Sequence, residues 1–240
     1  MKYLKVVFIA GGGKFGVRAL KTINRARYPG IVVDTSHNCD ASKLVDGIGT
    51  DAYKEVQYAI KYSCTRLVIS DAKEALWRLF HSGMMPLIMV PAIPGHFASE
   101  SIKFIAMKKG KSIEKADREE ILRVVEYLPK SVICSIDFNS SRIVTSYMTK
   151  HLCKVPCCEP IICPKTGRVR FTPMYELLQI ALNKVYEGMI LQSHFLGEDV
   201  GGFYGFDFTE ALEKVLDYQG IFAIGTSCRC HGVIDLLKLS

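Results

Sequence analysis

Two clusters of cysteine carry the most reactive side chains of this sequence. The first is HLCKVPCCEPIICPKTG and the second is SCRCHG, where a histidine directly follows the last cysteine. Together they hold six of the nine cysteines: Cys153, Cys157, Cys158, Cys163, Cys228 and Cys230. Thiolate sulfur binds zinc and iron–sulfur clusters and is also a nucleophile, so each cluster could be part of a metal site or a redox site.

The spacing of these cysteines differs from that of the common metal motifs. It contains no C-x-x-C pair of a zinc ribbon and no ferredoxin run. Adjacent residues of an extended chain point to opposite faces, so only one of the neighbours Cys157 and Cys158 is expected to bind a given ion. The expected tetrahedral site takes one ligand from each of these: Cys153, the Cys157/Cys158 pair, Cys163, and the Cys228/Cys230 pair.

Three kinds of chemistry fit such a site. Four thiolates suit an iron–sulfur cluster and zinc almost equally, because the softness of the ligands does not separate the two. In the third, no metal is bound and the thiols react directly, with Cys230 paired to His231 or with a disulfide between Cys157 and Cys158. The clusters follow two predicted strands, RIVTSYM and GIFAIGT, and we expect them to meet at one edge of a sheet.

The segment LKVVFIAGGGKFGVRALKTINRA contains a motif for binding phosphate groups. An apolar strand leads into Gly11, Gly13 and Gly16 with G-x-G-x-x-G spacing, and residues at helical spacing follow. A second strand, GIVVD, ends in Asp34, 18 residues after Gly16. The glycines allow a tight turn, close approach of a pyrophosphate and close helix packing, while the helix offers free N–H groups. The acid can accept hydrogen bonds from a ribose 2′-hydroxyl, which favours NAD over NADP.

Over about residues 3–95, this pattern resembles the Rossmann-type NAD-binding family, especially potassium-transport regulators and saccharopine-dehydrogenase-like proteins. The resemblance implies that Gly11, Gly13, Gly16 and Asp34 hold NAD or NADP. Folds that bind S-adenosylmethionine also place a glycine loop and an acid here. The identity of the nucleotide is therefore less well defined than its presence.

The remaining pattern predicts an α/β protein with a Rossmann-like parallel sheet. Strands TRLVIS and PLIMVPAIPGH alternate with the helix DAKEALWRLFHSG, which is expected to begin at Asp71. His96 follows the latter strand, so it is a candidate for proton transfer near a nicotinamide, or it simply begins the next helix. His231 is the second candidate for proton transfer.

The second half continues with helices and strands and is expected to form a C-terminal α/β extension carrying the cysteine-rich loop. The residues DREEILRVVEYLP, MYELLQIALNKVY and DFTEALEKVLDYQ predict helices, and DFNSS predicts the turn of a β-hairpin. The runs GMILQSHFL and GIFAIGT predict strands, the second closing the chain. We expect a dinucleotide-binding domain at 1–110 and a second domain at 111–240.

Composition narrows the classes of partner. The net charge is +7, but the lysines are spread along the chain without interleaved aromatic residues, so nucleic acid is not an expected partner. No run is long enough for a membrane span, and VVFIA is too short for the core of a signal peptide. A cytoplasmic protein with reduced thiols is therefore expected.

These features together predict an NAD(P)-binding oxidoreductase with a cysteine-ligated iron–sulfur or zinc site. Its expected partner is a small-molecule substrate or an electron carrier, and a homo-oligomer is possible. The first alternative is a non-catalytic NAD- or redox-sensing module with a structural zinc. The second is a transferase that uses S-adenosylmethionine in the same cleft.

Overall fold

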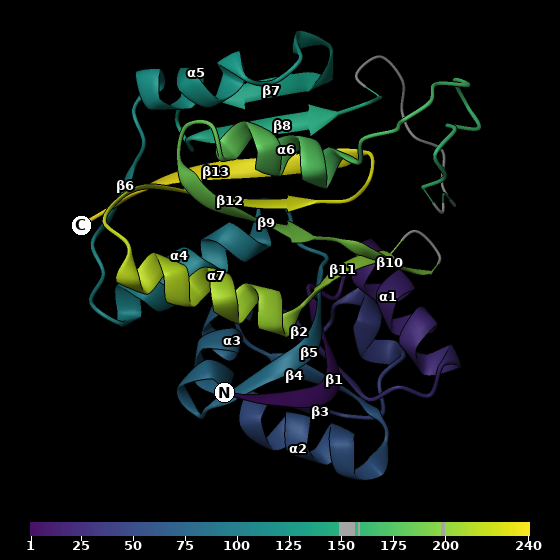
Figure 1. Cartoon of the computed structure of the whole chain (residues 1–240). Coiled ribbons are helices and arrows are strands. Elements are labelled where there is room, and N and C mark those ends of the chain that lie inside the picture. Colours follow the sequence, from purple (N-terminus) through teal and green to yellow (C-terminus); the bar gives the residue numbers. More distant parts are fainter. Residues whose placement is uncertain (149–156, 158, 198–199) are drawn as a thin grey trace. The chain divides into compact units, whose positions relative to one another are not determined.

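The computed structural model describes residues 1–148, 157, 159–197 and 200–240, and it divides the chain into two compact units (Figure 1). Unit 1 comprises Met1–Ile105 and His194–Glu210, and unit 2 comprises Ala106–Ser193 and Ala211–Ser240. The first boundary lies close to the one expected at residue 110. The return of His194–Glu210 to unit 1 was not expected, because it depends on strand pairing between segments far apart in the sequence.

Unit 1 is built on a sheet whose described strands follow the order β10-β11-β5-β1-β2-β4-β3. The five strands from β5 to β3 are parallel, and β11 and β10 extend the β5 edge in antiparallel fashion. The predicted α/β class with a parallel sheet is confirmed. The strands are β1 (Lys2–Ala10), β2 (Gly30–Asp34), β3 (Ile48–Gly49), β4 (Thr65–Ile69), β5 (Met84–Pro91), β10 (His194–Gly197) and β11 (Val200–Tyr204).

Helices alternate with the parallel strands, as the sequence predicts. Asp71 begins α3, because its carboxylate accepts hydrogen bonds from the N–H groups of Lys73 and Glu74, at 2.9 and 3.1 Å. Strand β1 is buried on both faces, as its apolar sequence predicts, because the neighbouring side chains of Phe8 and Ile9 are both fully enclosed. The helical segments are α1 (Lys14–Arg25), the 3₁₀ turn η1 (Asp40–Lys43), α2 (Ala52–Tyr62), α3 (Ala72–His81) and α4 (Phe97–Lys108), which continues into unit 2.

Unit 2 contains a second sheet, with described strands in the order β7-β8-β13-β12-β9 and β6 paired to β13. All pairs are antiparallel except β12 with β9. The hairpin predicted around DFNSS is confirmed as β7 and β8. The strands are β6 (Ile113–Lys115), β7 (Ile133–Asp137), β8 (Arg142–Ser146), β9 (Glu187–Gln192), β12 (Gly220–Ser227) and β13 (His231–Leu239). The helical segments are α5 (Arg118–Glu126), the 3₁₀ turn η2 (Lys130–Val132), α6 (Met174–Leu182) and α7 (Gly205–Asp217), which begins in unit 1.

Two strand predictions were wrong. The run GMILQSHFL forms two strands rather than one, because β9 pairs with β12 in unit 2 whereas β10 pairs with β11 in unit 1. The run GIFAIGT does not close the chain either. The residues after SCRC form β13, which pairs with β12 along its whole length from Gly220↔Leu239 to Ser227↔Gly232. An apolar pattern identifies a strand but does not show which sheet it joins.

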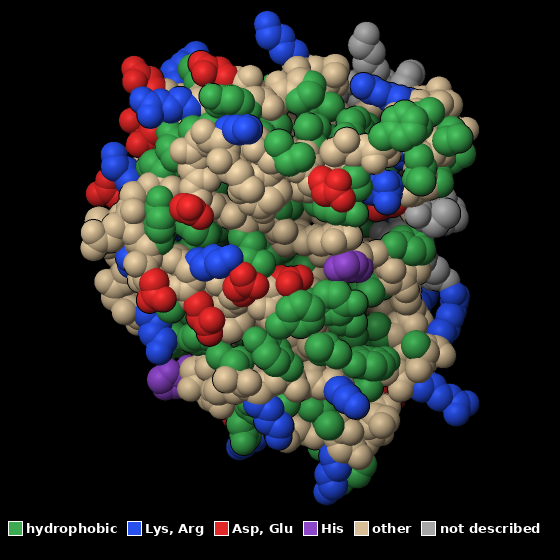
Figure 2. Space-filling model, in the orientation of Figure 1, with side chains coloured by type: hydrophobic (Ala, Val, Ile, Leu, Met, Phe, Trp, Pro, Cys, Tyr) green, Lys and Arg blue, Asp and Glu red, His purple; other side chains and the backbone are tan. Residues whose placement is uncertain are grey.

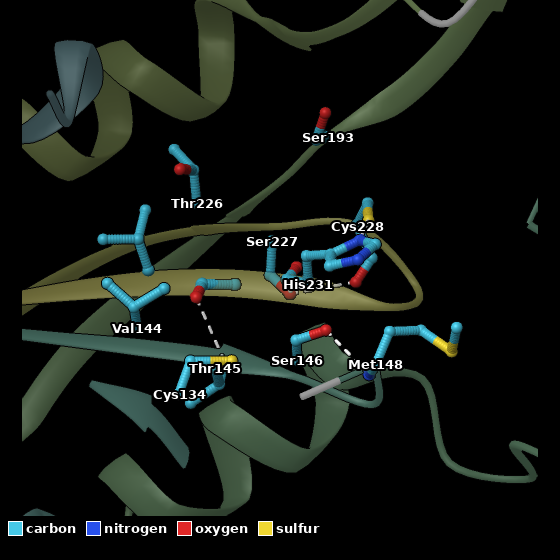
Figure 3. A pocket seen from close by; sticks show the side chains of 12 residues that line it. Cys134, Val144, Thr145, Ser146, Met148, Ser193, Thr226, Ser227, Cys228 and His231 are labelled. Atoms are coloured by element: carbon cyan, nitrogen blue, oxygen red, sulfur yellow. Dashed lines mark hydrogen bonds between the residues drawn. The ribbon is translucent and has the colours of Figure 1, made fainter. Parts of the chain in front are cut away.

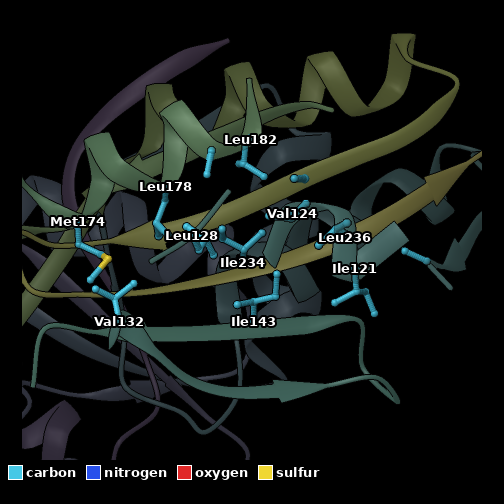
Figure 4. Close-up of a cluster of buried hydrophobic side chains, with 13 residues drawn as sticks. Ile121, Val124, Leu128, Val132, Ile143, Met174, Leu178, Leu182, Ile234 and Leu236 are labelled. Atoms are coloured by element: carbon cyan, nitrogen blue, oxygen red, sulfur yellow. The ribbon is translucent and has the colours of Figure 1, made fainter. Parts of the chain in front are cut away.

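The core of unit 2 lies between this sheet and the helices α5 and α6 (Figure 4). Ile143 of β8 and Ile234 of β13 point from the sheet into it, and Leu178 of α6 and Val124 of α5 meet them from the helices. Because alternate residues of β13 enter this core, Val233 and Asp235 lie on the opposite face of the sheet. That opposite face carries the pocket described below.

The positive charge of the chain is not gathered in one place on the face shown in Figure 2, where Lys and Arg side chains are scattered and interspersed with acidic ones. This distribution agrees with the scattered lysines of the sequence. Among the described residues, no helix has both the length and the apolar character needed to cross a membrane.

A charged pair joins two central strands of unit 2. Arg142 of β8 donates from Nε and Nη2 to the two carboxylate oxygens of Asp235 on β13, at 2.7 and 2.9 Å. Asp235 is completely buried, so its charge depends on this two-pronged contact.

We predict that Asp235→Asn lowers the free energy of unfolding by about 3 kcal/mol, because the Arg142 guanidinium then faces an uncharged amide. Urea denaturation followed by circular dichroism measures the loss. Glu74→Gln is the matched control: it removes the partner of Arg78 in an exposed ion pair and should cost less than about 0.5 kcal/mol. Equal losses in the two variants would contradict the assigned role of the buried pair.

Candidate functional site

The glycine loop of unit 1 lies at the carboxyl end of β1, where the order of the parallel strands reverses between β2 and β5. Gly11 has a positive φ of 104°, and its N–H donates to the carbonyl of Val33 at 2.8 Å. A Cβ at Gly16 would lie 1.9 Å from the carbonyl oxygen of Gly11. A side chain at Gly11 would collide with Ala92 and Ile93 after β5, and a side chain at Gly16 would push α1 away from the loop that follows β1.

Asp34 holds this loop in place. Its two carboxylate oxygens accept hydrogen bonds from the N–H groups of Gly12, at 2.7 Å, and Ser36, at 2.8 Å. The Cys39 side chain packs against Gly12, where burial and the nearby Asp34 carboxylate raise the pKa of the thiol. A carboxylate has about four acceptor positions, so Asp34 can still accept a hydrogen bond from a ligand.

The N-terminus of α1 differs from those of α2, α3 and α5. Each of those helices begins with an aspartate that accepts hydrogen bonds from the first turn, whereas α1 begins at Gly13 without any side-chain cap. Its first turn has no acidic residue and includes Lys14. A Cβ built at Gly13 meets no atom within 4 Å, so the space beside this residue is open. Uncapped N–H groups facing open space form a potential anion-binding position.

The role of His96 in proton transfer stays a prediction. The residue is only 2% exposed, and it lies at the start of α4. Its backbone N–H donates to the Glu100 carboxylate at 3.3 Å, and its carbonyl accepts from the Glu100 N–H at 3.0 Å. The alternative reading, a histidine that begins the next helix, describes this geometry better.

In unit 2, the SCRCHG segment forms the turn of the hairpin between β12 and β13. The Cys228 N–H donates to the His231 carbonyl at 3.0 Å, and the hydroxyl of Ser227 donates to the same carbonyl at 2.8 Å. Within the turn, the N–H of Cys230 donates to the sulfur of Cys228 at 3.4 Å. The ring atom Nδ1 of His231 lies 3.7 Å from the same sulfur. From the sequence we expected His231 to act with Cys230. In the structure its ring lies beside the sulfur of Cys228 instead.

The described part of the first cysteine loop lies against this turn. Glu159 accepts a hydrogen bond from the backbone N–H of Arg229 at 3.1 Å. The guanidinium of Arg170 donates to the sulfur of Cys230 and to the carbonyl of Pro160. The two sulfur-bearing segments therefore meet within unit 2, as expected from their positions after strands. The contact runs through an arginine and a glutamate that the cysteine pattern did not identify.

The two thiols of the turn have opposite electrostatic environments. A hydrogen bond from Cys228, supported by the Arg170 guanidinium, lowers the pKa of Cys230, although burial and the nearby Glu159 and Cys157 oppose this shift. The same contact with Cys230, followed by burial, raises the pKa of Cys228 far above its ordinary value, and His231 opposes that shift. The thiolate form is therefore favoured at Cys230 over Cys228.

The metal site predicted from the cysteines stays a prediction. Cys153 and Cys158 lie outside the described residues, and no group of three or more His, Cys, Asp or Glu side chains within the described part of the chain is placed to hold a metal ion. The Cys163 sulfur lies 3.8 Å from the sulfur of Met148, and a hydrogen bond from Thr166 lowers the pKa of its thiol. The sulfur atoms of Cys163 and Cys230 thus face different partners.

A pocket of about 530 Å³ opens beside the turn, on the face of the sheet opposite the core (Figure 3). Cys228 and His231 line it together, and Val144, Met148 and the exposed Cys134 add apolar surface. A pocket of this volume accommodates a small organic molecule. Sequence reasoning did not find it, because its walls come from strands that are distant in the chain.

Arg170 and Glu159 are the residues of this site that sequence reasoning missed. The only available signal was their position, Glu159 directly after Cys158 and Arg170 in the basic segment GRVRF. A charged residue in a loop is normally solvated, so neither position indicated a buried contact.

Comparison with known proteins identifies the family. The family model AF_1314_C, described as "Uncharacterized protein, C-terminal domain", matches residues 98–240, more than half of the chain, and the chain belongs to this family. A relative from Archaeoglobus fulgidus, described as an uncharacterized protein, is 27% identical over 230 residues, which cover 96% of this chain and 98% of the relative.

A solved structure also aligns with the chain. It is N5-carboxyaminoimidazole synthase from Aspergillus clavatus in complex with ADP and 5-aminoimidazole ribonucleotide, with 15% identity and a TM-score of 0.22. The alignment covers 97% of this chain, which spans 46% of the length of that enzyme. A TM-score this low supports no conclusion about fold or function.

We predict that Gly16→Ala lowers the free energy of unfolding by about 3 kcal/mol, because the new methyl group would overlap the carbonyl of Gly11. Gly13→Ala should cost less than about 1 kcal/mol, since that position faces open space and only a favourable cap residue is lost. Urea denaturation of both variants measures the difference. Similar losses at the two positions would contradict the loop geometry.

Proposed function

We propose that the protein is an NAD(P)-dependent oxidoreductase that binds its dinucleotide in unit 1 and prefers NAD to NADP. The observation that carries this proposal is the uncapped N-terminus of α1, which faces open space at Gly13 and follows a loop closed to side chains at Gly11 and Gly16. The pyrophosphate would accept hydrogen bonds from the N–H groups of this turn, with Lys14 adding positive charge.

Asp34 supports the choice of NAD. Its carboxylate ends β2 beside the loop and would accept a hydrogen bond from a ribose 2′-hydroxyl. A 2′-phosphate in the same position would be repelled by the carboxylate. The Asp34 contact with Gly12 also keeps the loop in its binding conformation, so one residue would serve both loop and ligand.

We predict that the protein binds NADH and that Asp34→Asn weakens this binding about tenfold, equivalent to about 1.4 kcal/mol. The variant keeps an acceptor for the Gly12 N–H but loses the charge that discriminates against NADPH, so the preference for NADH over NADPH should shrink. Titration followed by the fluorescence of the reduced nucleotide measures both affinities.

Asp51→Asn is the control for this experiment, because Asp51 also begins a helix of unit 1 through a carboxylate contact but is not part of the glycine loop. It should leave nucleotide affinity unchanged. Failure of the unaltered protein to bind NADH, or an equal loss in both variants, would contradict the proposal. Binding of S-adenosylmethionine in place of NADH would support the transferase instead.

A second function, a non-catalytic NAD- or redox-sensing module, is favoured by the burial of His96. That burial restricts the access of a substrate to this candidate for proton transfer. Incubating the NADH complex with an artificial electron acceptor, such as ferricyanide, separates the two functions. We expect the bound NADH to be oxidised faster than free NADH, whereas binding without any acceleration would favour the sensor.

A further inference from the structure

The turn between β12 and β13 holds two thiols two residues apart, one buried and one at the wall of a pocket. We propose that Cys228 and Cys230 are a redox-active dithiol that exchanges two electrons with a low-molecular-weight disulfide bound in this pocket. The proposal concerns unit 2 and does not depend on nucleotide binding by unit 1.

The geometry of the turn allows the two sulfurs to be joined. Two residues of chain span at most about 7 Å, and a disulfide needs Cα atoms about 4.4–6.8 Å apart. The N–H of Cys230 already donates to the Cys228 sulfur at 3.4 Å, so the Cys228 side chain is folded back toward Cys230. Both thiols are free in this structure.

The surroundings give the two cysteines different roles. Cys230 is 1% exposed, so it cannot meet an external disulfide, and its sulfur contacts the guanidinium of Arg170, which is itself 3% exposed. A buried guanidinium stabilises an adjacent thiolate strongly, because little water screens the two charges. Cys228 is partly exposed and lines the pocket, so it is the sulfur that a ligand can reach.

His231 provides the proton acceptor that Cys228 needs. Its Nδ1 lies 3.7 Å from the Cys228 sulfur, a separation that a small rotation of either side chain shortens to hydrogen-bond length. Both side chains line the same pocket, as Figure 3 shows. The apolar walls at Val144 and Met148 favour a small disulfide with apolar substituents over a highly charged one.

The reaction proceeds in two exchanges. Cys228 transfers its proton to His231 and attacks one sulfur of the ligand disulfide, which breaks that bond and releases one thiolate; this thiolate takes the proton from His231 and leaves as a thiol. The Cys230 thiolate then attacks the Cys228 sulfur and expels the second half of the ligand as a thiolate. The protein dithiol is oxidised to a disulfide, and the ligand disulfide is reduced to one thiol and one thiolate, which takes its proton from water.

The test is equilibration of the full-length protein, without oxygen, in mixtures of reduced and oxidised dithiothreitol, followed by alkylation and digestion with trypsin. Trypsin cleaves after Arg229, between the two cysteines, so peptides 215–229 and 230–238 stay joined only if Cys228 and Cys230 form a disulfide. We expect the joined peptides to appear in one two-electron transition. Incubation with 4,4′-dithiodipyridine, a small aromatic disulfide, should produce the same joined peptides.

Variants assign the roles. Cys228→Ser and Cys230→Ser should each abolish the joined peptides, whereas Cys134→Ser, at another wall of the same pocket, should retain them. Arg170→Met should lower the equilibrium constant for reduction about tenfold, which is about 30 mV for a two-electron couple, because the thiolate of the reduced form loses its partner. Arg170→Lys keeps the charge and should restore most of that loss. Circular dichroism confirms that each variant is folded.

Several results would overturn the proposal. Recovery of the two peptides separately at every ratio of dithiothreitol would show that no disulfide forms in the turn. A disulfide from either cysteine to a different partner would also contradict it. Stoichiometric zinc or iron that blocks alkylation of both cysteines until a chelator is added would replace the dithiol by a metal site.

Discussion

A buried charge needs compensating partners. In unit 2 this requirement applies to the buried guanidinium of Arg170. An uncompensated charge at such a site costs several kcal/mol, more than most single contacts contribute to a fold. The Arg170 guanidinium donates hydrogen bonds to the sulfur of Cys230 and the carbonyl of Pro160. These two contacts join the first cysteine loop to the hairpin turn and place a positive charge beside the Cys230 sulfur.

Unit 1 satisfies a similar requirement with backbone groups. Asp34 accepts hydrogen bonds from two backbone N–H groups, and the glycines let the strand, the loop and the helix approach more closely than any side chain would permit. The N–H groups at the start of α1 are left without a side-chain cap as a result of this construction. In unit 2 the buried charge of Asp235 is balanced by Arg142. In unit 1 the electropositive N-terminus of α1 has no side-chain cap and could accept a phosphate.

The two units thus offer different chemistry in one chain. We propose nucleotide binding for unit 1 and exchange of electrons at sulfur for unit 2. Each proposal has its own observations and its own test. The family match over residues 98–240 includes every unit 2 residue that carries the thiol proposal, from Glu159 and Arg170 to the turn at Cys228 and Cys230. The glycine loop lies outside the matched range, so its interpretation depends on geometry alone.

The sequence by itself determined the parallel sheet of unit 1 and the glycine loop with Asp34, because each depends on short-range patterns of apolar, glycine and turn residues. It did not determine the course of His194–Glu210 or the central position of β13, since an apolar strand reads the same whichever sheet it joins. The partners of the thiols also needed the tertiary structure. Arg170 and Cys230 are 60 residues apart, and only the folded chain excludes the water that would otherwise have screened one from the other.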